Sequence, residues 1–111
     1  KEGRDKTSEQ KQGGEEKDSK VRAAKLYYRV AQLQFDEDQF AAAITSFQKS
    51  LTLGLSGKKV GTALLMQGNS YFELADYKDA KLYFSKALAE PSSSNSARAW
   101  LDYMQQLELF E

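Results

Sequence analysis

The sequence contains neither cysteine nor histidine among its 111 residues. These absences exclude disulfides, zinc sites built on Cys and His, and any mechanism that relies on a thiolate or an imidazole. Sixteen basic and sixteen acidic residues cancel, so no net charge attracts the chain to nucleic acid or an anionic membrane. No apolar run approaches the roughly eighteen residues that a membrane-spanning helix needs. We therefore expect no metal, no cofactor, no nucleic acid partner and no direct membrane insertion, while the compartment stays open.

Large apolar side chains are also missing from the first part of the chain, which mixes charged residues with Gly, Ser, Thr and Gln. Ordering a backbone residue costs about 1–2 kcal/mol, and such a segment cannot offset that cost by burial. We therefore expect residues 1–18 to form a disordered charged linker and residues 19–111 to form the folded domain. The chain begins at Lys1 without a methionine or a signal-like apolar stretch, which suggests a processed or excised fragment.

From Ser19 onward, apolar residues recur every three and four positions, which is the period of an amphipathic helix. The pattern is interrupted by an acidic segment after Phe35, by Gly54, by Asp76 and by a turn that begins at Pro91. No segment alternates convincingly with period two, so we expect no sheet. The predicted helices cover about 19–35, 40–51, 58–74, 77–88 and 95–107, with Ser19, Asp76 and either Ser94 or Asn95 as N-caps.

A pattern of small and aromatic residues occurs twice in these helices. Ala80 and Phe84 correspond to Ala43 and Phe47, which stand 37 residues earlier. Small residues at such positions let two antiparallel helices pack closely, and a repeat of this length is typical of stacked helical arrays. Arrays of this kind usually bind other molecules, and the sequence has no nucleophile paired with a base. We therefore expect a protein that is not an enzyme.

The repeated unit resembles the tetratricopeptide repeat family, whose period is about 34 residues and whose signature includes Leu-Gly-x2-Tyr, Ala-x3-Phe and a Pro. The second copy reads Leu64-x2-Gln67-Gly68-x2-Tyr71, then Ala80-x3-Phe84, then Pro91, and the first reads Tyr27-x2-Val30-Ala31-x2-Gln34, then Ala43-x3-Phe47, without the Pro. Trp100-x2-Tyr103-Met104-x2-Leu107 looks like the start of a third unit. The three extra residues per period fall within Leu53 to Lys59, which implies a longer second helix or a wider turn.

The resemblance implies an all-α fold, a short right-handed α-solenoid of two antiparallel helix hairpins and a C-terminal capping helix. These parts correspond to residues 24–57, 61–94 and 95–111. It also implies a scaffold or adaptor that binds a peptide or helix of another protein in a concave groove, which the first helix of each unit lines. The family's frame places on that groove the residues Lys25, Tyr28, Gln32, Phe35, Leu65, Asn69, Phe72, Glu73, Leu101 and Gln105.

Two alternatives to an open peptide groove stay possible at this point. The apolar members of the groove set can simply pack against neighbouring helices. The chain can also be a structural self-assembly element, in which the apolar groove or the capping helix forms a homo-oligomer. The family's carboxylate clamp is absent, because Tyr28, Gln32 and Met66 stand where its Lys and two Asn residues would be.

Overall fold

The structure is a computed structural model that describes the backbone of residues 2–109 and the side chains from residue 17 onward. Within these limits the chain forms five helices and no strand, which confirms the all-α prediction. The helices are α1 (Glu2–Asp36), α2 (Phe40–Thr52), α3 (Lys58–Glu73), α4 (Tyr77–Leu88) and α5 (Ser94–Gln106).

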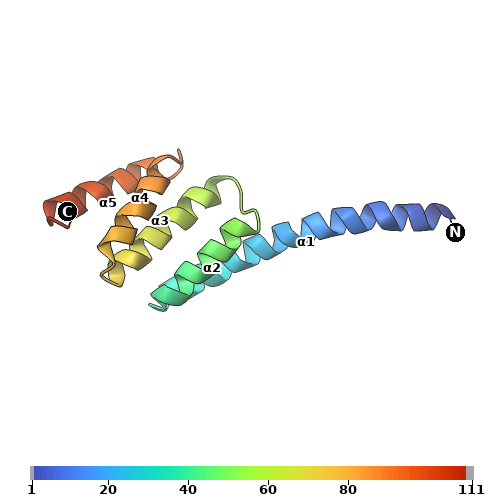
Figure 1. Ribbon diagram of the computed structural model, residues 1–111, viewed down its shortest axis with the longest axis horizontal. Coiled ribbons are helices and arrows are strands. Elements are labelled where there is room, and N and C mark those ends of the chain that lie inside the picture. Colours follow the sequence, from blue (N-terminus) through green and yellow to red (C-terminus); the bar gives the residue numbers. More distant parts are fainter. Residues whose placement is uncertain (1, 110–111) are drawn as a thin grey trace.

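The five helices form two hairpins followed by a single helix (Figure 1). The most extensive contacts are those of α1 with α2 and of α3 with α4, and the hairpins stack through α2 and α3. Helix α5 packs mainly against α4 and touches α3. The molecule measures 68 × 27 × 20 Å, and its long axis includes the N-terminal part of α1, which projects beyond the other helices.

Helix α1 begins at Glu2, so the prediction of disorder over residues 1–18 and of a helix start at Ser19 is corrected for the backbone of residues 2–18. Opposite charges such as Asp18 and Arg22 stand four residues apart, a spacing that supports an exposed helix without burial. Extension of an existing helix also avoids the cost of nucleation. The functional division into linker and domain stays a prediction; residue 1 and residues 110–111 lie outside the described part.

The first hairpin is built on alanines at the crossing of α1 and α2. Ala24, Ala31 and Ala43 are buried, and their small side chains let the two helices approach while Phe47 fills the space between them. The buried Ser50 hydroxyl donates a hydrogen bond to the backbone carbonyl of Ala24. The small-residue positions that the repeat pattern identified therefore form the core of this hairpin.

The connection between the hairpins explains the extra residues in the repeat. Helix α2 ends at Thr52, so the additional residues form a wider turn and not a longer helix. Gly54 and Gly57 have φ angles of 103° and 75°, in the left-handed region that glycine adopts at little cost. Leu55, between them, folds back and joins the first core.

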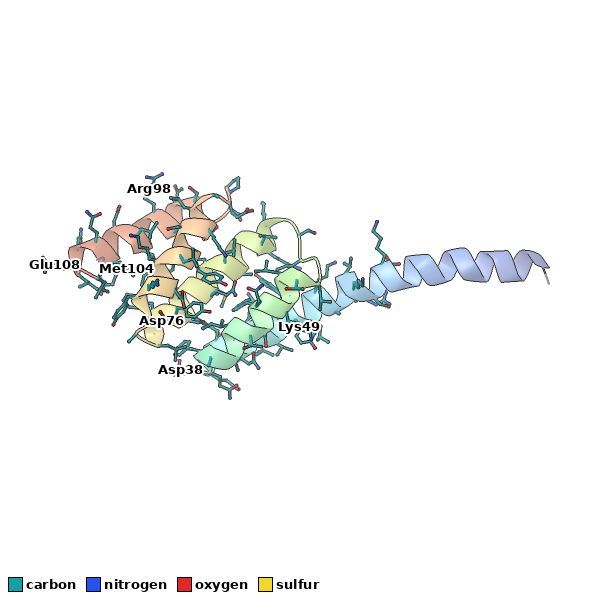
Figure 2. All side chains as sticks on the ribbon, in the orientation of Figure 1. Asp38, Lys49, Asp76, Arg98, Met104 and Glu108 are labelled. Atoms are coloured by element: carbon teal, nitrogen blue, oxygen red, sulfur yellow. The ribbon has the colours of Figure 1, made fainter. Side chains whose placement is uncertain are left out.

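The second hairpin requires glycine where α3 crosses α4. A Cβ atom on Gly68 would lie 2.6 Å from Cδ1 of Phe84, closer than any ordinary contact. The predicted cap of α4 is confirmed, because the side chain of Asp76, which Figure 2 labels, accepts a hydrogen bond from the Asp79 amide at 3.2 Å. The predicted cap of α5 was wrong: Ser93 precedes that helix, and its hydroxyl donates to the carbonyl of Ala87 at 2.7 Å, which ties the turn to α4.

Candidate functional site

The ten predicted groove residues lie on α1, α3 and α5, the first helices of the successive units. They differ in how far solvent reaches them. Tyr28 is buried, and three polar residues are exposed: Lys25, Glu73 and Gln105. The remainder are half-buried: Gln32, Phe35, Leu65, Asn69, Phe72 and Leu101.

Tyr28 is mainly a core residue of the first hairpin. Its side chain is 8% exposed and meets the Phe47 ring edge to face, with the ring centroids 6.0 Å apart. The ammonium group of Lys59, at the start of α3, lies 5.8 Å from the Tyr28 ring centroid. Most of the Tyr28 side chain is therefore used in packing, and only a small part of its ring reaches solvent.

Phe72 likewise joins helices rather than standing free in a groove. Its ring centroid lies 5.4 Å from that of Tyr77, 5.3 Å from that of Trp100 and 6.2 Å from that of Tyr103. Leu65 also packs against this second core. The two apolar members of the predicted groove set on α3, Leu65 and Phe72, therefore pack largely against α4 and α5.

A depression with a volume of about 560 Å³ lies between α1 and the start of α3. Four of its lining residues are basic and none is acidic, although the chain as a whole has no net charge. We call this hollow the basic depression; its lining residues are Arg22, Lys25, Leu26, Tyr28, Arg29, Gln32 and Lys59.

Sequence reasoning found three of these residues and missed the charges that define the depression. Lys25, Tyr28 and Gln32 were in the predicted groove set, whereas Arg22 and Arg29 were not. The signal that identifies them is their spacing, because basic residues three, four and seven positions apart share one side of a helix. Lys59 was also outside the predicted set, and it reaches the same hollow because α3 lies beside α1.

Buried amides occur where the two hairpins meet. The side chain of Gln67 is fully buried, and its Nε2 donates to Oε1 of Gln48 at 3.4 Å. The Tyr83 hydroxyl donates to the same oxygen, also at 3.4 Å. Within the described residues, Oε1 of Gln67 and Oδ1 of Asn69 have no hydrogen-bond partner. Asn69 therefore holds its amide oxygen inside the array, and its role in a groove stays a prediction.

Tyr71 stacks on Tyr83 across α3 and α4, with the ring centroids 5.3 Å apart. Burial raises the pKa of Tyr71 above its usual 10.0, and the nearby Tyr83, Asp79 and Asp76 add to the shift because negative charges disfavour a tyrosinate. The pKa of Asp79 is raised as well, first by its side-chain hydrogen bond with Asp76.

The raised pKa of Tyr71 predicts a loss of stability at alkaline pH. The folded state holds the Tyr71 proton more tightly than the unfolded chain does, so this contribution is complete below the unfolded pKa of about 10 and is lost as pH rises through the folded value. Urea unfolding measured between neutral pH and pH values above that range should show a declining free energy of unfolding. In the Tyr71→Phe variant, the free energy of unfolding should decline less over the same pH range. If the decline is the same in the variant, other titratable groups cause it.

Comparison with known proteins decides the family. The family model of the tetratricopeptide repeat matches residues 24–53 and 61–90, and the two matches begin where the predicted units begin. The chain belongs to the tetratricopeptide repeat family. Tetratricopeptide repeats are protein–protein interaction modules without catalytic function, which agrees with the lack of any nucleophile–base pair in the sequence. No curated protein and no solved structure matches the chain.

None of the described helices is long and apolar enough to cross a membrane. No group of three or more acidic side chains in the described part is arranged to hold a metal ion.

Proposed function

We propose that this chain is a scaffold or adaptor module that binds an acidic, amphipathic peptide or helix of a partner protein on its concave side. The observation that carries the proposal is the basic depression, in which Arg22, Lys25, Arg29 and Lys59 converge without an acidic neighbour in the lining. The same depression contains apolar surface from Leu26 and from the exposed edge of Tyr28. A ligand that pairs acidic groups with an apolar side chain matches this surface.

The two kinds of contact have different roles in such a complex. An exposed ion pair contributes at most about 1 kcal/mol, so the four cations favour acidic partners and speed their approach more than they add affinity. An aromatic or aliphatic side chain buried against Leu26 and Tyr28 contributes about 1.5–3 kcal/mol. A helix offers both on one face, because residues three and four positions apart lie together.

The proposal is tested with synthetic fluorescent peptides that have Leu or Phe at helical spacing and Glu on the flanking positions. We expect such a peptide to bind, and its affinity to fall with added salt because exposed charges are screened. Arg29→Glu should weaken binding about tenfold, which corresponds to about 1.4 kcal/mol. Lys25→Glu should have a similar effect, and fluorescence anisotropy measures both.

The matched control is Lys86→Glu, which makes the same charge reversal at an exposed site on α4. It should leave the affinity close to that of the unaltered chain. If Lys86→Glu and Arg29→Glu lowered the affinity equally, the peptide would respond only to the total charge of the chain and not to the basic depression. Tighter binding of a peptide with Lys in place of Glu would exclude an acidic partner.

A further inference from the structure

A second hollow adjoins the basic depression, where the turn between the two hairpins lies against α1. Its volume is about 340 Å³, and no acidic residue lines it. Lys25 and Lys59 line both hollows, so a ligand in one of them meets the border of the other. We call the second one the lysine hollow; its lining residues are Val21, Ala24, Lys25, Gly54, Leu55, Ser56, Lys58 and Lys59.

The three lysines of this hollow come from two helices that the fold brings together. Lys25 belongs to α1, whereas Lys58 and Lys59 are the first residues of α3. The Lys59 ammonium group lies 5.8 Å from the ring centroid of Tyr28, which also lines the basic depression. Like charges that gather at one place repel one another, so the hollow favours a ligand with negative charge.

One carboxylate of the chain shares a different hollow with one of these lysines. Glu90, just after the end of α4, lines the hollow between the turn that joins the hairpins and the turn that follows α4, and Lys58 lines it as well. Lys25 and Lys59 do not line that hollow, and Glu90 does not line the lysine hollow. The negative charge of Glu90 therefore compensates at most Lys58, and two cations stay available to a ligand.

We propose that the lysine hollow binds a phosphorylated side chain of the same partner whose acidic, amphipathic segment occupies the basic depression. The inference rests on the proposed function and adds a second, more highly charged contact to it. Because Lys25 and Lys59 border both hollows, a phosphorylated residue about one helical turn beyond the acidic segment reaches the lysine hollow.

The chemistry of the lining favours phosphate over a carboxylate. A phosphorylated side chain carries a charge of about −1.5 to −2 at neutral pH and has three acceptor oxygens. The lysine hollow offers compact ammonium charges with three N–H donors each, and the hydroxyl group of Ser56. The basic depression differs, because it contains Arg22 and Arg29, whose planar guanidinium groups match carboxylates. A single carboxylate in the lysine hollow would leave more of its positive charge uncompensated.

The first experiment measures the affinity of the full chain for three versions of one fluorescent peptide by anisotropy. The acidic, amphipathic peptide is extended by one helical turn at either end, and the added residue is serine, glutamate or phosphoserine. At one of the two ends, phosphoserine should tighten binding about tenfold or more relative to serine. Glutamate should add less than about fivefold, the effect of one exposed ion pair. If phosphoserine gained no more than glutamate at both ends, the proposal would be wrong.

A variant assigns the gain to the lysine hollow. Lys58 lines this hollow but not the basic depression, and its side chain is exposed, so Lys58→Ala should fold, which circular dichroism verifies. The variant should bind the serine peptide like the unaltered chain, and the gain from phosphoserine should fall to about threefold or less. Lys86→Ala, at an exposed lysine of α4, is the matched control and should retain the full gain. An unchanged gain in Lys58→Ala, or an equal loss in both variants, would overturn the proposal.

Inorganic phosphate tests the hollow without any peptide. In heteronuclear NMR spectra, it should shift the amide signals of Gly54 and Ser56, and the shifts should be smaller in Lys58→Ala. If the serine peptide binds and phosphoserine adds nothing, this inference fails and the proposed function stands. If phosphate shifts these signals but no peptide binds, the proposed function fails and the anion site stands alone. Tighter binding of free phosphate than of the phosphoserine peptide would assign the hollow to a small anion and overturn the peptide proposal.

Discussion

Replacing Phe84 with alanine is expected to lower the free energy of unfolding by about 3–5 kcal/mol, a large part of the stability of an array this small. The side chain is fully buried, and its ring stacks on Trp100 with the centroids 5.2 Å apart. It also fills the space above Gly68, so its removal opens a cavity that touches α3, α4 and α5 together. Urea denaturation followed by circular dichroism measures the loss.

The same helix supplies the control for this prediction. Leu82→Ala removes an apolar side chain of α4 that is about half exposed, and its cost should stay near 0.5 kcal/mol or below. If Phe84→Ala cost no more than Leu82→Ala, the contact of Phe84 with Gly68 and Trp100 would not be the centre of the second core. The slope of the unfolding free energy against urea concentration gives a second result. A smaller slope for Phe84→Ala than for the unaltered chain would indicate that the two hairpins unfold separately.

The helices and their crossings could be predicted because the sterics there allow few residues. Gly68 opposite Phe84 and the alanines of the first hairpin occur at positions where a larger side chain would force two helices apart. Such positions recur with the repeat, so the fold can be read from their spacing. Asp76 was predictable for a similar reason, since a carboxylate that caps a helix acts within four residues of the chain.

The site was less predictable because it depends on how the hairpins stack. The sequence left open whether Phe72 lines a groove or packs against neighbouring helices, and its contacts with Trp100 and Tyr103 depend on residues about thirty positions later. The basic depression needs Lys59 beside Arg29, and nothing in the local sequence brings α3 next to α1. The start of α1 was misjudged because the first part of the chain lacks large apolar residues, and composition does not predict a helix that is supported by the spacing of its charges.

Tyr28→Ala is expected to cost about 3 kcal/mol or more of the free energy of unfolding, because this predicted groove residue is 8% exposed and packs against Phe47 in the first core. The conservative variant Tyr28→Phe retains the ring and therefore the packing. It should unfold within about 0.5 kcal/mol of the unaltered chain. Chemical denaturation of both variants beside the unaltered chain gives the comparison.

The same pair of variants separates packing from recognition at the basic depression. If Tyr28 acts mainly in the core, Tyr28→Phe should bind the acidic peptide almost as well as the unaltered chain, while Arg29→Glu loses affinity at unchanged stability. A Tyr28→Ala chain with full stability and lost binding would instead make Tyr28 a true groove residue. Because the ring edge borders both the core and the depression, stability and affinity measured on the same variants are needed to assign its role.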